Sequence, residues 1–277
     1  MSAANPGRAP SLLKVAFVGA RFFLILSLAV VLWMGLCSGE FSVSRLVKEQ
    51  GVRGISCELK EALGGCSDPG IPVQVAGALR TVSILLPTEA DRENLKLGLR
   101  RDCAFIGAYT LAYVCLAVLL FWRDDWVPGK LLGPVALLLA MVTAGCDVGE
   151  DIFTWRVLDR LHGKYGEGAS REDRDTVVPE QEDAARGDVK MKQCCGYAKW
   201  YANFTLWMVF ALVWLRWNRR WHMLAGGLLF IGGLCGVILG GISPACIQYA
   251  FLTAALGLLI GTVILCFCVK SPEELWN

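Results

Sequence analysis

The sequence has little charge and almost no histidine. Only 19% of its 277 residues are Asp, Glu, Lys or Arg, 55% are hydrophobic, and the formal net charge is +2. Soluble domains carry about 25% charged residues, so this chain is too apolar for an ordinary soluble domain. Its near-neutral charge argues against nucleic acid as a partner. The two histidines, His162 and His222, lie far apart in the sequence, so we expect no histidine-based metal site.

Several enzyme motifs are also missing. The sequence contains no P-loop, no nucleophile elbow, no His-x-x-Glu-His zinc motif and no Cys-x-x-Cys pair. These absences weigh against an enzyme without excluding one.

Long apolar runs are what the chain has in abundance. A helix that spans a bilayer needs about 20 mainly apolar residues. We therefore predict an all-α polytopic membrane helix bundle of the cell membrane, surrounded by lipid, with about six spans. The third of these segments is the least regular, because its apolar part ends near Cys146. The six segments are residues 15–37, 103–122, 131–153, 197–217, 222–242 and 247–268.

The first apolar segment follows Arg8 and Lys14, as the apolar part of a signal peptide would. No small-x-small cleavage site follows it, and the apolar stretch from Val15 is long for a signal peptide. An uncleaved first span therefore fits better than a cleaved signal.

Basic residues set the expected orientation. With six spans, nine of the 27 Lys and Arg residues fall on one side, in short loops, at span ends or at the termini. Such residues favour the cytoplasmic side, so both termini should be cytoplasmic and the two long loops external. The nine are Arg8, Lys14, Arg21, Arg123, Lys130, Arg216, Arg219, Arg220 and Lys270.

This topology divides the chain into an N-terminus, a first span, a long external loop, a five-span bundle with a second external loop, and a tail. The corresponding residues are 1–14, 15–37, 38–102, 103–268 with the loop at 154–196, and 269–277.

The first external loop carries two further expectations. Thr88 follows a proline and is a good helix N-cap, and no proline occurs from there to Phe121. We expect one continuous helix that begins outside and runs into the second span. Cys57 and Cys66 flank eight residues that end in two glycines, so a disulfide and two free thiols both remain open there.

Three acids stand near the end of the third apolar segment. Asp147, Glu150 and Asp151 have i, i+3 and i+4 spacing, which places them on one face of a helix. If the span begins near Leu131, a rise of 1.5 Å per residue puts Glu150 about 28 Å further along. That depth is the external edge of the hydrocarbon layer.

Neighbouring spans bring polar groups to the same depth. Asp102 opens the second span with Tyr109 seven residues later, and Lys199 enters with the fourth span. Charged residues at span ends often only extend to interfacial water, and this interpretation fits Asp151 and Arg156 best. Ionisable residues inside a bundle usually pair with one another and mark binding sites or pathways. We therefore predict that Glu150 or Asp147 meets Lys199, with Asp102 and Tyr109 close by.

Short motifs on these spans resemble a family. "DCAFIGAY" from Asp102, "DVGED" from Asp147 and "AKW" around Lys199 are similar to a pattern in uncharacterised bacterial multi-pass membrane proteins. Those proteins show D-x-x-E-N on the middle span, where this chain has Asp151 in place of Asn. The resemblance implies a shared polar site but no activity.

The last two apolar segments carry small residues at four-residue spacing. Gly232, Gly236 and Gly240 lie on one, and Thr253, Gly257 and Gly261 lie on the other. Small residues let helix backbones approach closely in lipid, so we predict tight packing within an antiparallel hairpin.

Three functions remain open from the sequence. The first is binding or transport of a small solute, a proton or a lipid head group at the charged site. The second is a membrane enzyme that uses an acidic metal site, since D-x-x-E-D is similar to aspartate-rich motifs of membrane prenyl- and phosphatidyl-transferases. No second such motif occurs. The third is a structural or assembly factor. The sequence leaves the cofactor, if any, and the oligomeric state unknown.

Overall fold

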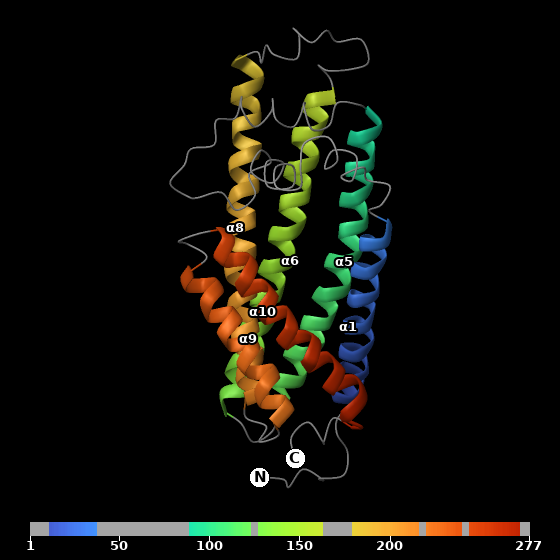
Figure 1. Cartoon of the computed structure of the whole chain (residues 1–277), viewed down its shortest axis with the longest axis vertical. Coiled ribbons are helices and arrows are strands. Elements are labelled where there is room, and N and C mark those ends of the chain that lie inside the picture. The colour runs from blue at the N-terminus through green and yellow to red at the C-terminus, as the bar shows by residue number, and fades with distance from the viewer. Residues whose placement is uncertain are drawn as a thin grey trace. The chain divides into compact units, whose positions relative to one another are not determined.

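The computed structural model describes residues 11–37, 89–122, 127–162, 179–215, 220–239 and 244–271. This part of the chain is almost entirely helical and contains no strand, which confirms the all-α prediction. Figure 1 shows the elements, which are α1 (Ser11–Cys37), α5 (Glu89–Phe121), α6 (Val127–His162), α8 (Pro179–Leu215), α9 (Arg220–Leu239), α10 (Pro244–Val263) and the π-helix η1 (Ile264–Cys268).

Five stretches are long and apolar enough to cross a membrane. Five of the six segments expected from the sequence coincide with them, including the irregular third one. The fourth expected segment is helical as far as Leu215 within α8, but it is not among the five. Lys199, Asn203 and several Trp and Tyr residues lower its mean hydropathy. The five are Ser11–Val30, Lys96–Phe121, Lys130–Arg156, Trp221–Ile238 and Ala250–Cys268.

Three helices are much longer than a bilayer requires. α5, α6 and α8 have 33, 36 and 37 residues. At 1.5 Å per residue they measure about 50–56 Å, against about 30 Å for the hydrocarbon layer. α5 is continuous from Glu89 to Phe121, as the sequence predicts. The predicted N-cap, Thr88, and the cysteines Cys57 and Cys66 lie outside the described residues.

The expected external loop 154–196 is helical at both ends. α6 continues to His162 and α8 already begins at Pro179. The polar composition of these stretches suggested a solvated loop. The polar ends are helical because each helix gives the other an ion-pairing partner, as described below for α6 and α8.

The chain forms two compact units, and α5, α6 and α8 each contribute to both. One unit comprises residues 1–29, 107–144 and 200–277, and the other comprises residues 30–106 and 145–199. The first unit is apolar and rich in aromatic side chains. In it, the buried Trp207 donates a hydrogen bond from Nε1 to the Tyr113 hydroxyl at 2.8 Å, and Phe210 packs beside Tyr113.

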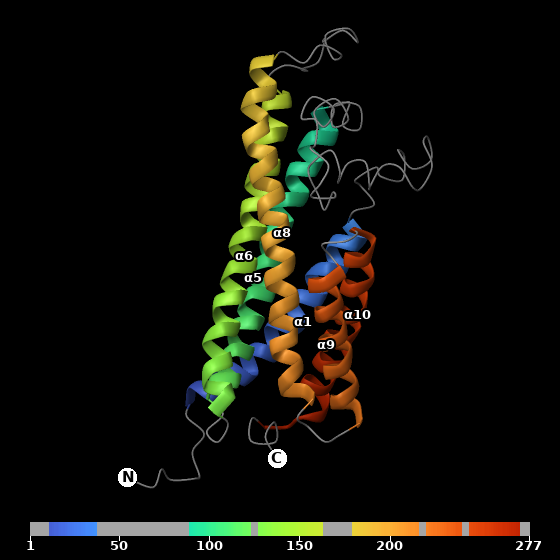
Figure 2. The same cartoon turned by 90° about the vertical axis from the view of Figure 1, so that its left-hand side faces the viewer.

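Glycines set the closest helix contacts of the first unit. α9 and α10 run side by side as the last two helices (Figures 1 and 2). A Cβ atom at Gly232 would lie 2.6 Å from the Ala254 nitrogen, and one at Gly257 would lie 2.8 Å from the Ala225 oxygen. These two glycines therefore pack within the hairpin as predicted.

Two other glycines of the predicted stripe face α8 instead. A Cβ atom at Gly236 would lie 2.4 Å from Phe204 Cγ, and one at Gly261 would lie 3.1 Å from Trp214 Cζ2. Four-residue spacing identifies a helix face but not its partner, so the sequence could not show that aromatic rings of α8 fill these gaps. Gly240 lies outside the described residues.

Arg21 joins α1 to η1, the π-helix that follows α10. Arg21 donates from Nε to the Leu265 oxygen at 2.8 Å and from Nη2 to the Val269 oxygen. The π-helix η1 leaves carbonyl groups without their usual partners at this end. Arg21 satisfies them, which explains a cation inside an otherwise apolar helix.

Candidate charged site

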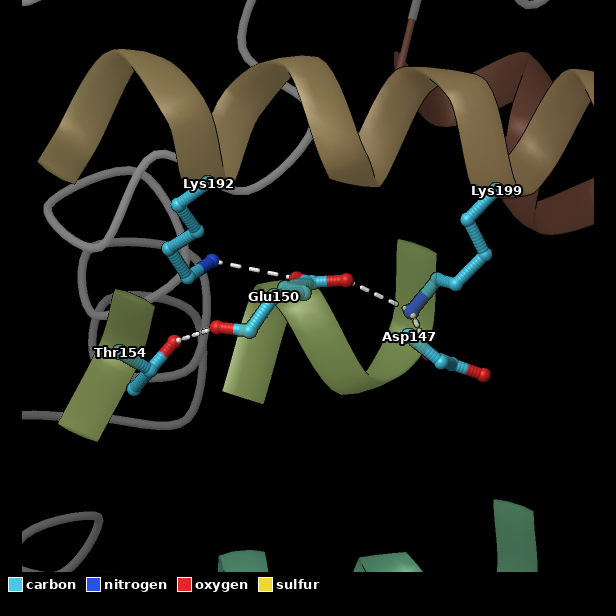
Figure 3. A network of polar contacts seen from close by, with 5 residues as sticks. All are labelled: Asp147, Glu150, Thr154, Lys192 and Lys199. Carbon is cyan, nitrogen blue, oxygen red and sulfur yellow. Dashed lines mark hydrogen bonds and ion pairs between the residues drawn. The ribbon is translucent and has the colours of Figure 1, made fainter. Parts of the chain in front are cut away.

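A cluster of four ionisable side chains joins α6 to α8. Lys199 Nζ donates to Asp147 Oδ1 at 2.6 Å and to Glu150 Oε2 at 2.7 Å. Lys192 Nζ donates to the other Glu150 oxygen, Oε1, at 3.1 Å. Figure 3 shows Glu150 held between the two lysines. The predicted meeting of Lys199 with Glu150 or Asp147 is present, and Lys199 contacts both acids.

Helical periodicity explains why these residues converge. Asp147 and Glu150 are three residues apart on α6, and Lys192 and Lys199 are seven apart on α8. Both spacings keep side chains on one helix face. The exposed fractions of the side chains are 6% for Lys192, 15% for Asp147, 19% for Lys199 and 21% for Glu150. Low exposure strengthens the attraction between opposite charges, because little water screens it.

Sequence reasoning missed Lys192. It sits in a stretch that appeared to be a solvated loop, and Lys199 was the only cation expected from this helix. The available indication was the seven-residue spacing, which places both lysines on one face once α8 is known to extend outward.

Close packing of α6 on α8 surrounds the cluster. A Cβ atom at Gly149 would lie 2.9 Å from Cys195 Sγ, and one at Gly196 would lie 3.9 Å from the Glu150 carboxylate. Burial, with a smaller contribution from neighbouring thiols, raises the pKa of the Cys195 thiol. Cys195 therefore stays a neutral packing residue. Thr154 donates its hydroxyl to the Glu150 backbone oxygen at 2.8 Å, within α6.

Asp102 and Asp151 belong to the same unit but form no ion pair within the described part of the chain. Each lies within electrostatic range of the other and of Asp147, Glu150 and Lys199. The Asp151 Oδ2 atom is buried and has no hydrogen-bond partner among the described residues. The residue as a whole is only partly buried, so the interfacial position that the sequence suggested for Asp151 stays a prediction.

Tyr109 is placed in the other compact unit. It is buried, and its ring packs against Tyr113 at a centroid distance of 5.5 Å. Its predicted position beside the charged cluster stays a prediction.

Two arginines of α5 lie over aromatic rings. Arg100 lies over the Trp155 ring at 5.1 Å, and Arg101 lies over the Trp33 ring at 5.2 Å. Lys96 pairs with Asp159 at 2.6 Å and thereby links α5 to α6. These contacts link α5 to α6 and to α1, whereas the two lysines of α8 pair with Asp147 and Glu150.

An outer ion pair completes the contacts of this unit. Arg156 lies 3.8 Å from Asp188, and its side chain is 59% exposed. This is the interfacial arrangement expected for Arg156.

The acids of the described residues do not form a recognisable metal site. No group of three or more His, Cys, Asp or Glu side chains there is arranged to hold a metal ion. Lysines occupy Oδ1 of Asp147 and both carboxylate oxygens of Glu150. Nothing in this geometry favours the acidic metal site of the enzyme hypothesis.

Comparison with family models, curated proteins and solved structures finds no match to this chain. The likeness to bacterial multi-pass proteins therefore rests on its three short motifs alone.

Proposed function

We propose that the chain is a multi-pass protein of the cell membrane with six spans and both termini in the cytoplasm. Five stretches meet the length and hydropathy of a span, and the second half of α8 supplies the sixth. An even number of spans returns the C-terminus to the side of the N-terminus. The basic residues of the short loops support the cytoplasmic assignment of that side.

We propose further that Asp102 and Asp151, which belong to the same compact unit as the charged cluster, bind a small cation at the external ends of α5 and α6. The cation is a proton, a monovalent metal ion or the ammonium group of a small solute or lipid head group. The observation that supports this is an imbalance of charge. Four carboxylates interact within this unit, and the two lysines of the cluster pair with only two of them.

The paired and unpaired acids have different roles in this proposal. Lys192 and Lys199 neutralise Asp147 and Glu150 and fix α6 against α8. Asp102 and Asp151 then interact electrostatically, with no cation of the described residues bound to either. Two partly buried carboxylates repel, and binding one positive charge removes that repulsion. Partial exposure of both side chains gives the cation a way in from water.

Currents on solid-supported membranes test this function. Proteoliposomes receive concentration jumps of protons, sodium, potassium or choline. We expect a saturable transient current with at least one of these cations, because binding moves charge within the protein. The current should disappear in the double variant Asp102→Asn with Asp151→Asn.

Asp159→Asn is the matched control. Asp159 is an acid of the same unit that Lys96 already neutralises, so its removal should leave the current in place. A current that survives in the double variant, or no current with any of the four cations, would refute the proposal.

A further inference from the structure

Thr143 is a buried threonine with an unused hydroxyl. Only 2% of the residue is exposed, and Oγ1 has no hydrogen-bond partner in the described part of the chain. Other helical hydroxyls of this protein donate to the backbone oxygen four residues earlier. Ser27 does so at 2.6 Å, and Thr154, Thr205 and Thr262 do so at 2.8 Å. Thr143 departs from this behaviour at a site with almost no access to solvent.

Asn203 carries a second buried oxygen of this kind. Its Oδ1 atom is buried and accepts no hydrogen bond from any described residue. A buried polar atom without a partner costs about 1–3 kcal/mol, so native proteins keep only a few of them.

The antiparallel pairing of α6 with α8 brings Thr143 and Asn203 to matching heights on the two helices. Asp147 meets Lys199, and further out Arg156 meets Asp188, so residue numbers rise on α6 as they fall on α8. Thr143 precedes Asp147 by four residues, and Asn203 follows Lys199 by four. One helical turn, about 6 Å of rise, therefore separates both residues from the ion pair in the same direction. Both belong to the same compact unit.

We propose that Thr143 and Asn203 bind a buried water molecule between α6 and α8. The Thr143 hydroxyl donates to the water oxygen, and the water donates to Asn203 Oδ1. Buried waters in proteins typically satisfy polar groups that have no other partner. The site goes beyond the cation site, because it uses other residues and exists whether or not a cation binds. The water molecule at this site hydrates one position within the apolar segment of α6.

Water–methyl NMR contacts test the site directly. The protein is labelled at threonine methyl groups and studied in lipid nanodiscs. We expect a cross-peak between water and the Thr143 methyl group, assigned by its loss in Thr143→Val, and a marked loss of this cross-peak in Asn203→Leu. Thr262, whose hydroxyl is bonded within its helix, is the control and should show no such peak. Absence of the Thr143 peak in the unmodified protein, or its persistence in Asn203→Leu, would overturn the proposal.

Thermal unfolding gives an independent result. If one water bridges the two side chains, each single variant strands the remaining group, so both single variants lower the Tm. The double variant Thr143→Val with Asn203→Leu should then lower the Tm by less than the sum of the two single effects. If either single variant raises the Tm instead, the oxygen it removes had no partner at all, and the water site is ruled out.

Discussion

At the scale of single residues, Lys199 decides the electrostatics of the site. It is 19% exposed and contacts two acids at 2.6 and 2.7 Å. Removing one member of a buried ion pair leaves the other charge without compensation, which costs more than removing both. Glu150 also has Lys192 as a second partner.

A double-mutant cycle with Lys199→Met and Glu150→Gln measures this coupling. We expect the double variant to be more stable than the two single effects predict, with a coupling of about 1–3 kcal/mol. Thermal unfolding in detergent provides the measurement. Arg156→Met with Asp188→Asn is the control, and its exposed pair should couple by about 0–1 kcal/mol. Strictly additive effects at Lys199 and Glu150 would mean that their contact contributes nothing to stability.

At the scale of secondary-structure elements, apolar length and periodicity predicted most of the helices. The unbroken run of α5 to Phe121 followed from the lack of proline. The sequence did not predict that α6 and α8 extend beyond their apolar segments, because the stability of these polar ends comes from ion pairs between helices that are distant in sequence. Lys192 and Asp188 pair with residues of α6 that are distant in the sequence, so the sequence did not predict these two contacts.

Glycine packing gives an element-scale prediction for the α9–α10 hairpin. Gly232→Val should lower stability by about 1–3 kcal/mol, because its Cβ atom meets backbone atoms of α10 that cannot move aside. Gly227→Val is the matched control, since a Cβ atom at Gly227 meets nothing within 4 Å. Thermal unfolding of both variants in one detergent compares them. Equal losses at the two positions would show that helix propensity, not close packing, governs this hairpin.

At the scale of the whole molecule, the proposed topology fixes which face of the membrane the charged cluster meets. Reporter fusions after Asn277 and at Ser170 test it. We expect a cytoplasmic signal at Asn277 and an external signal at Ser170, because nine basic residues favour the opposite side from the long loops. The reverse pair of signals would turn the cluster toward the cytoplasm, and two signals on one side would contradict six spans.

The central claim is that the site has more acids than cations and binds a positive charge at Asp102 and Asp151. Thermal unfolding of Asp151→Asn, with and without the cation that gives a current, tests this claim most directly. Without the cation the variant should unfold at a higher temperature than the unmodified protein, because it removes a repelling charge. The cation should stabilise the unmodified protein and have no effect on the variant. A variant that unfolds at a lower temperature without the cation, or that the cation still stabilises, would contradict the account.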